Sequence, residues 1–252
     1  MEPLTLFIGI IGNVISVLMF LSPAGTFWRI VKNRSTEDFE SLPYICTLLN
    51  ASLWTYYGII KPGAYLVATV NGFGIVVEIA YVALFLSYAP RKMKVKTGTL
   101  VGILNVGFLA AAMGVTWVAL EGEGRIDAIG FISSVLNIVM YGSPLAAMKT
   151  VVTSKSVEYM PFLLSFFLSL NGGIWTFYAF LTKDLFLGVP NGTGFLLGAA
   201  QLIIFAMFRN AKPSTTTALW NTNSTSYGTL EEGGHIEPLI SIPDQEIRLI
   251  RG

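Results

Sequence analysis

The chain has 252 residues, of which 53% are hydrophobic and 12% are charged, whereas soluble domains carry about 25% charged residues. This composition, with a mean hydropathy of +0.64, indicates an integral membrane protein, and the formal net charge of +1 argues against a nucleic-acid partner. The single cysteine, Cys46, excludes an intrachain disulfide, and the single histidine, His235, excludes a histidine metal site or proton relay in the membrane.

Seven apolar runs are long enough to cross a bilayer as helices, which takes about 20 residues each. Helices are expected because a spanning segment must satisfy its backbone hydrogen bonds internally. We predict spans at residues 5–27, 42–60, 65–88, 98–120, 128–148, 161–181 and 186–208. Residues 213–252 are rich in Ser, Thr, Asn, Gly and acidic residues, so we predict a disordered cytosolic tail there.

The first three spans and the last three carry the same motifs at an offset of about 120 residues. The motifs are Ser-Pro at 22–23 and 143–144, Leu/Met-Pro at 42–43 and 160–161, Asn-x-x-x-Trp-x-x-Tyr at 50–57 and 171–178, and Asn-Gly-x-Gly at 71–74 and 191–194. Two three-span units in the same orientation need an odd linker span between them. We therefore predict an all-α membrane protein of seven transmembrane helices, with parallel repeats at residues 1–97 and 128–212 and a linker helix within 98–127. Such a duplication is typical of a transporter whose site lies between its halves.

Lys and Arg are distributed unevenly between the loops on the two sides of the membrane. One side carries eleven of them, and the other carries three, which are Lys61, Arg125 and Lys183. Short loops that are rich in Lys and Arg lie on the cytosolic side. The N-terminus is therefore predicted to be luminal or extracellular, and the C-terminus cytosolic.

These features together resemble the SWEET family of sugar facilitators, in its plant form, over residues 5–212. The resemblance rests on the three-plus-one-plus-three arrangement, on four matched prolines, and on the segments 155–162 and 189–192. The stretches 41–57 and 141–155 look most like the vacuolar-membrane branch, which is associated with fructose and other hexoses. The resemblance implies a passive uniporter that works by alternating access without a cofactor. It also implies residence in the vacuolar membrane, with the plasma membrane as the alternative.

Each repeat has an Asn and a Trp four residues apart on one helix face of its second span, and a further Asn in its third span. These residues are Asn50, Trp54 and Asn71 in the first repeat and Asn171, Trp175 and Asn191 in the second. An amide donates and accepts hydrogen bonds without charge, and an indole offers a flat apolar face, which together suit a sugar. The alternatives are that the asparagines only join helices and that Trp54 belongs to an interfacial belt.

The resemblance adds roles to these residues. It implies that the two third-span asparagines bind the sugar, that the two tryptophans line its cavity, and that Asn50 and Asn171 match lining positions that are often Ser in other members. Four further residues match positions that narrow the sugar cavity in the family: Ser16, Met19, Asn137 and Met140. Paired methionines at these positions suggest a monosaccharide, while the alternative is that they only fill space in the core.

Pro23, Pro43, Pro144 and Pro161 lie near the cytosolic ends of their spans. Proline removes a backbone hydrogen bond and kinks a helix, and the resemblance implies that the four prolines act as a cytosolic hinge and gate. The alternative is that a proline only marks the end of a helix. For Pro43 and Pro161 that alternative fits about as well as the hinge and gate does. It fits Pro23 and Pro144 poorly, because apolar sequence continues past them.

Tyr57, Lys61 and Asp184 lie near span ends on the other side and are candidates for a luminal gate, although a solvated loop pair is the alternative for Lys61 and Asp184. Glu78 is the one acidic residue within a predicted span, and an intramembrane carboxyl group is a functional candidate. A structural hydrogen bond is the favoured interpretation of Glu78, because no basic or histidine partner is expected in the membrane.

The leading hypothesis is bidirectional, passive transport of monosaccharides, fructose or glucose, across a membrane. The alternative is a proton-coupled sugar transporter that uses Glu78. A seven-span receptor has no need of the duplication, and no nucleophile–base pair or paired carboxylates indicate an enzyme or a metal site. The expected partners are a small-molecule sugar and the lipid bilayer, and the glycine-rich spans allow a homo-oligomer.

Overall fold

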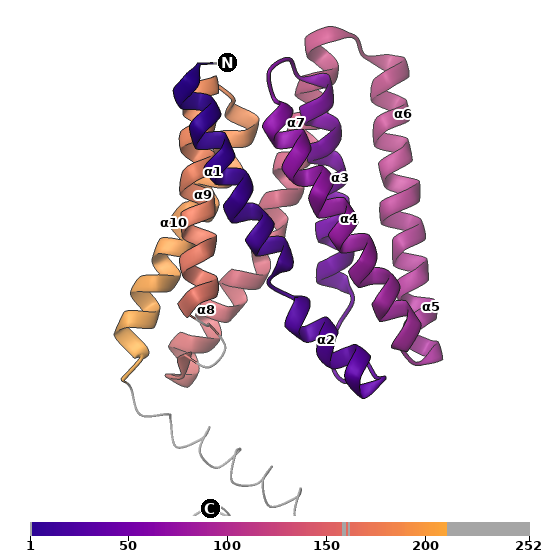
Figure 1. The fold of residues 1–252 in the computed structure, drawn as a ribbon, viewed down its shortest axis with the longest axis vertical. Helices are drawn as coiled ribbons and strands as arrows, with labels where there is room; N and C mark the ends of the chain where they lie inside the picture. Colours follow the sequence, from indigo (N-terminus) through magenta and orange to yellow (C-terminus); the bar gives the residue numbers. More distant parts are fainter. Residues whose placement is uncertain (1, 158–159, 161, 211–252) are drawn as a thin grey trace, which may run out of the picture. The chain divides into compact units, whose positions relative to one another are not determined.

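Ten α-helices and one π-helical segment make up the computed structural model, which describes residues 2–157, 160 and 162–210 (Figure 1). The predicted tail, 213–252, and the fourth proline, Pro161, lie outside the described residues. The helices form two groups and a linker, in the predicted three-plus-one-plus-three order. This confirms the fold class that the repeated motifs indicated.

The first group consists of α1 (Pro3–Leu21), α2 (Ala24–Asn33), α3 (Leu42–Ile60) and α4 (Tyr65–Tyr88). The second consists of α7 (Gly122–Met140), α8 (Gly142–Ser154), α9 (Phe162–Thr182) and α10 (Leu185–Phe208). The linker is one continuous helical run of α5 (Arg91–Leu100), the π-helical segment η1 (Val101–Phe108) and α6 (Leu109–Ala119).

The two groups repeat one packing pattern. In the first group α4 packs against both α1 and α3, and in the second group α10 packs against both α7 and α9 (Figure 1). The groups meet along two seams, where α1 lies against α9 and α3 lies against α7. Each seam therefore joins the first helix of one group to the second long helix of the other, as a pseudo-twofold arrangement requires.

The first span of each group is two helices rather than one kinked helix. The first group breaks at Ser22 and Pro23, between α1 and α2, and the second breaks at Tyr141, between α7 and α8. Pro23 directly precedes α2, and Pro144 lies in the first turn of α8, where a missing backbone N–H leaves no helical bond unmade. The alternative that a proline marks a helix boundary, which seemed unsuited to Pro23 and Pro144, thus describes both.

Six helical segments within the described residues are long and apolar enough to cross a membrane. They are 3–33, 65–88, 91–119, 122–154, 162–182 and 185–208. The remaining predicted span, 42–60, is α3, which has 19 residues and does not reach this apolarity. Nine of its residues are buried, and Thr47 and Asn50 line an internal cavity. Because polar side chains of a spanning helix face the interior of its bundle, α3 needs less apolar surface.

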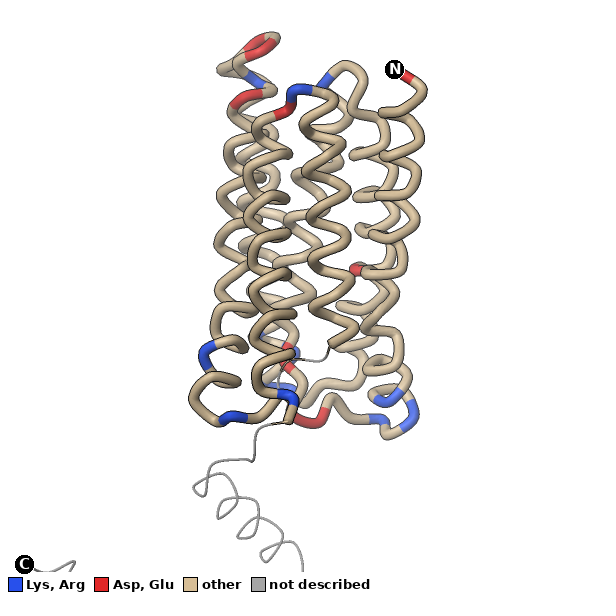
Figure 2. Tube along the Cα trace, turned by 90° about the vertical axis from the view of Figure 1, so that its left-hand side faces the viewer, with Lys and Arg blue, Asp and Glu red and all other residues tan. Residues whose placement is uncertain are grey.

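Lys and Arg gather at the end of the helices that lies away from the N-terminus (Figure 2). We call this the basic end; its cations are Arg29, Lys32, Arg34, Arg91, Lys92, Lys94, Lys96, Lys149, Lys155 and Arg209. The loop from α2 to α3 is held there by Glu37, whose Oε1 accepts from Arg29 Nε at 3.0 Å and from Asn33 Nδ2 at 2.7 Å. These hydrogen bonds lower the pKa of Glu37, and the bond from Arg29 has the larger effect.

Candidate functional site

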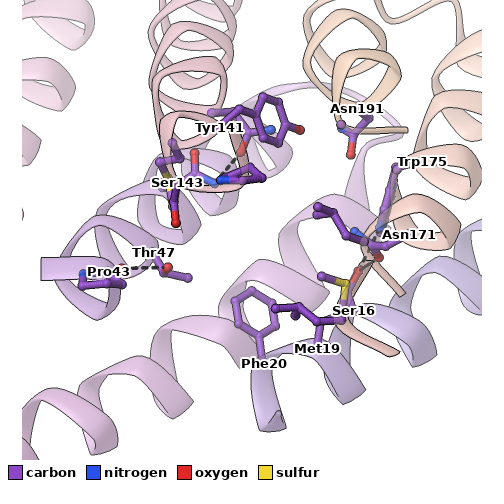
Figure 3. Close-up of a pocket in the computed structure, with 18 of the residues that line it drawn as sticks. Ser16, Met19, Phe20, Pro43, Thr47, Tyr141, Ser143, Asn171, Trp175 and Asn191 are labelled. Carbon is purple, nitrogen blue, oxygen red and sulfur yellow. Dashed lines mark hydrogen bonds between the residues drawn. The ribbon is translucent and has the colours of Figure 1, made fainter. Parts of the chain in front are cut away.

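A cavity of about 570 Å³ lies between the two groups of helices (Figure 3). Its walls come from the long helices of both groups and from α8. All ten residues predicted to bind or contact a sugar line it: Ser16, Met19, Asn50, Trp54, Asn71, Asn137, Met140, Asn171, Trp175 and Asn191. The repeated motifs therefore meet around one space, although they are far apart in the sequence.

Two matched hydrogen bonds cross the seams between the groups. Ser16 Oγ donates to Asn171 Oδ1 at 2.7 Å, and Asn50 Nδ2 donates to Asn137 Oδ1 at 3.0 Å. Ser16 and Asn137 are equivalent in the repeat, as are Asn50 and Asn171, so the two bonds are copies of one contact. The Oδ1 atom of Asn50 is buried and has no partner among the described residues. It is an acceptor that a ligand in the cavity could satisfy.

The two tryptophans line the cavity and are buried, with Trp54 4% and Trp175 5% exposed. Each packs edge-on against the tyrosine three residues later, with ring centroids 5.3 Å apart for Trp54 and Tyr57 and 5.3 Å for Trp175 and Tyr178. Trp175 Nε1 also donates to Ser16 Oγ at 2.9 Å. Ser16 therefore joins an indole and an amide on the cavity wall (Figure 3).

Replacing Ser16 by Ala is expected to lower the thermal midpoint of the purified protein. The change leaves Trp175 Nε1 and Asn171 Oδ1 without this partner, at a cost of about 1–2 kcal/mol. For a chain of this size each kcal/mol corresponds to about 2–4 °C. Differential scanning fluorimetry would measure the shift, with Ser87→Ala as the control. Ser87 is an exposed residue of α4 whose hydroxyl group donates to Ala83 O of the same helix. Equal midpoints for both variants would show that the Ser16 contacts do not stabilise the seam.

The third-span asparagines make the same local contact. Asn71 Nδ2 donates to Val67 O at 2.9 Å, and Asn191 Nδ2 donates to Leu187 O at 2.8 Å. Each bond uses one of the two amide hydrogens, and the amide oxygen takes no part in it. No other hydrogen bond involves either amide within the part of the chain that the structure describes. Both side chains are thus oriented by their own helix and keep a donor and an acceptor for the cavity.

An aromatic pair, Phe20 and Tyr141, lines the cavity together with Met19 and Met140. The Phe20 ring packs on Gly74 and the Tyr141 ring packs on Gly194, so that a Cβ at either glycine would collide with the ring. Tyr141 Oη also donates to Pro190 O at 2.8 Å. The motif analysis missed these rings. The signal was present, because Phe20 and Tyr141 follow the paired methionines at the repeat offset.

A buried polar cluster closes the molecule at the end away from the basic end, which we call the opposite end. Tyr57 Oη donates to Asp184, 2.9 Å from Oδ1 and 3.0 Å from Oδ2, and Lys61 Nζ lies 2.7 Å from Asp184 Oδ2. Asp184 also caps α10 by accepting from Leu187 N at 3.1 Å. Tyr57 is fully buried and Asp184 is 4% exposed, so the alternative of a solvated loop pair is wrong for Asp184.

Two tyrosines pack on two glycines beside this cluster. Tyr57 of α3 lies against Gly130 of α7, and Tyr178 of α9 lies against Gly9 of α1. These contacts are copies of one another, since both pairs are related by the repeat offset. The sequence analysis did not single out either glycine. Their place at the same point of each first span was the available signal.

We call the Tyr57–Asp184–Lys61 cluster and the two tyrosine–glycine contacts together the closed layer. The cavity extends from the closed layer toward the basic end. Among the described residues, its wall at the opposite end includes Val67 and Leu187, beneath the Tyr57 cluster, and near the basic end it includes Pro23, Pro43 and Pro144. Pro43 is the second residue of α3. Pro161 is not described, but its neighbour Met160 is buried and lines the cavity.

Glu78 of α4 also lines the cavity and is 3% exposed. Its Oε2 atom has no hydrogen-bond partner among the described residues, and none of their ion pairs involves it. The described residues thus show no hydrogen bond to Glu78 Oε2 of the structural kind that was favoured for this residue. Its counterpart in the second group is Gly198, which packs on Ser169.

Comparison with known proteins agrees with this architecture. Residues 6–93 and 127–213 match the family model described as a sugar efflux transporter for intercellular exchange. The chain is 60% identical to the bidirectional sugar transporter SWEET17 of Arabidopsis thaliana, over 96% of this chain and 100% of the relative. It is 57% identical to SWEET16 of Arabidopsis thaliana, over 84% and 93%. A solved structure of a eukaryotic SWEET transporter is 39% identical, with a TM-score of 0.78, over 81% of this chain and 96% of that chain.

Proposed function

The chain belongs to the SWEET family, and we propose that it carries monosaccharides, fructose and glucose foremost, passively and in both directions across a membrane. The observation that carries the proposal is the cavity between two matched groups of helices, into which both copies of the Asn/Trp motif project. The relatives named as bidirectional sugar transporters supply the substrate class.

The site residues suit an uncharged polyol. We propose that Asn71 and Asn191 bind sugar hydroxyls through the amide atoms that their own helices leave unused. Asn50 adds an acceptor that has no partner within the described part of the chain, and the two tryptophans add apolar faces for the sugar ring. A few hydrogen bonds of about 1 kcal/mol each favour weak binding and rapid release, as transport requires.

Alternating access follows from the closed layer and the helix breaks. We propose that the two repeats, residues 1–97 and 128–212, rock about the seams with 98–127 as linker. Opening the opposite end would separate Tyr57 from Asp184 and Gly130. The breaks at Pro23 and ahead of Pro144 are the hinges that would let α2 and α8 close the basic end, with Pro43 and Pro161 completing the gate.

The basic end is proposed to be cytosolic, because Lys and Arg accumulate on that side of membrane proteins (Figure 2). The N-terminus would then be luminal. We propose the vacuolar membrane as the location, since residues 41–57 and 141–155 resemble the vacuolar branch of the family. Fluorescence of a tagged full-length chain in plant cells would distinguish the vacuolar membrane from the plasma membrane.

Uptake of labelled sugars into proteoliposomes tests the function. We expect fructose and glucose to equilibrate at the same rate with and without a pH gradient, sucrose to enter more slowly, and Glu78→Gln to keep gradient-independent uptake. A passive carrier needs no proton, and glutamine cannot carry one. Protein-free liposomes are the control. Hexose accumulation that follows the pH gradient and is lost in Glu78→Gln would establish the coupled alternative, and no hexose uptake would exclude the proposal.

A further inference from the structure

Two cavity-lining side chains outside the Asn/Trp motif have unsatisfied acceptors. Glu78 of α4 is 3% exposed and Gln201 of α10 is 6% exposed. Glu78 Oε2 and Gln201 Oε1 are both buried without a hydrogen-bond partner among the described residues, although both residues line the cavity. A buried acceptor without a partner is costly. Such an atom on a cavity wall therefore indicates a ligand that supplies the missing donor.

Both residues lie nearer the basic end than the asparagines. Glu78 follows Asn71 by two helical turns on the same face of α4, which is about 10 Å along the axis. Gln201 follows Asn191 by nearly three turns, which is about 15 Å along α10. The Phe20 ring packs on Gly74 of α4, and the Tyr141 ring packs on Gly194 of α10. Both glycines lie between these two levels of their helices. The aromatic pair thus separates an asparagine level from a Glu78/Gln201 level.

The chemistry of this level fits sugar hydroxyl groups. The unsatisfied atoms are acceptors, and a polyol brings several O–H donors. No ion pair of the described residues involves Glu78, so the level is not organised around a cation of the chain. Neither residue recurs in the repeat, since Gly198 stands opposite Glu78 and Tyr81 opposite Gln201. The two acceptors are therefore not a by-product of the shared packing pattern.

We infer that Glu78 and Gln201 form a second sugar-binding subsite, which accepts hydrogen bonds from the sugar as it passes between the asparagine level and the basic end. The inference rests on the proposed function. With one residue on α4 and the other on α10, each repeat contributes one acceptor. A sugar moving between levels then exchanges one set of hydrogen bonds for another without a full return to water.

The first test is the KM of fructose uptake into proteoliposomes for Glu78→Leu, Gln201→Leu and Glu78→Gln. Loss of one hydrogen bond predicts a rise of about three- to tenfold in KM for each leucine variant. Glu78→Gln keeps an acceptor oxygen and should stay within about twofold of the wild type. Ser87→Ala, an exposed change on the same helix as Glu78, is the control. Leucine variants with wild-type KM would overturn the subsite alone, whereas a wild type without uptake would overturn the proposed function.

A second test does not depend on transport and covers leucine variants that fold poorly. With Cys46→Ser as background, Ala147→Cys places a reporter on α8, which lines the cavity and packs against α10. Fructose should slow the reaction of this thiol with a water-soluble methanethiosulfonate. The protection should persist in Asn71→Ala and in Asn71→Ala combined with Glu78→Gln, which keeps an acceptor oxygen. It should disappear when Gln201→Leu is added, or when Gln201→Asn is added, because the shorter side chain withdraws the acceptor by one methylene group. Protection that is already lost in Asn71→Ala would show a single sugar site and overturn the inference.

Discussion

Replacing both Asn71 and Asn191 by Ala is expected to reduce hexose uptake at least about tenfold. Each amide keeps one N–H donor and one acceptor oxygen for a ligand, because its own helix uses only one N–H. Losing bonds of about 1 kcal/mol each from two residues removes several kcal/mol of binding, where about 1.4 kcal/mol is a factor of ten. Initial rates of fructose and glucose uptake into proteoliposomes measure the loss.

The control for this prediction is an intramembrane asparagine that does not line the cavity. Asn105 of η1 donates to Ile45 O of α3 at 3.2 Å and therefore joins helices. Asn105→Ala should lower the thermal midpoint and leave the KM of uptake within about twofold. The two single variants, Asn71→Ala and Asn191→Ala, should resemble each other because the residues have matched contacts. If Asn105→Ala reduced uptake as strongly as the double variant, the asparagines would be packing residues and not a sugar site.

The repeat made the cavity predictable. Residues at equal positions in two copies of one helical unit must come to equivalent places around a pseudo-twofold axis, so Asn50 and Asn171 could be placed together without any knowledge of side-chain contacts. The same argument extends to pairs that were not used, such as Phe20 with Tyr141 and Gly9 with Gly130. Small residues and rings escape notice because their role lies in the contact and not in their own chemistry.

Features without a counterpart in the other repeat were less predictable. Asp184 forms its cluster with Tyr57 and Lys61 of the other group, and nothing in the local sequence indicates that a carboxyl group at the start of α10 is buried. The missing partner of Glu78 Oε2 is likewise a property of the packed helices. The breaks at Pro23 and ahead of Pro144 do recur in both repeats, but they depend on how apolar helices continue after a missing hydrogen bond, which hydropathy does not report.

Replacing Gly130 by Ala is expected to prevent closure of the opposite end and to reduce hexose uptake about tenfold or more. A Cβ at this position would lie 2.7 Å from Phe186 Cγ and 2.8 Å from Tyr57 Cε2. The Tyr57 ring has little freedom to move away, because Asp184 and Lys61 hold its hydroxyl group. Overpacking of this kind costs about 1–3 kcal/mol, which shifts the balance between closed and open states roughly 5- to 150-fold.

Gly124→Ala is the matched control on the same helix, since a Cβ there meets no atom within 4 Å. It should keep wild-type uptake, and Gly9→Ala, whose Cβ would lie 2.9 Å from Tyr178 Cε2, should behave like Gly130→Ala. A conformational readout separates closure from folding. In a Cys46→Ser background, a cysteine at Leu187, beneath the closed layer, should react faster with a thiol reagent in Gly130→Ala, because the opposite end stays open. Unchanged reactivity together with unchanged uptake would mean that the tyrosine–glycine contacts do not form the barrier. The proposed mechanism would then depend on the Tyr57–Asp184–Lys61 cluster alone.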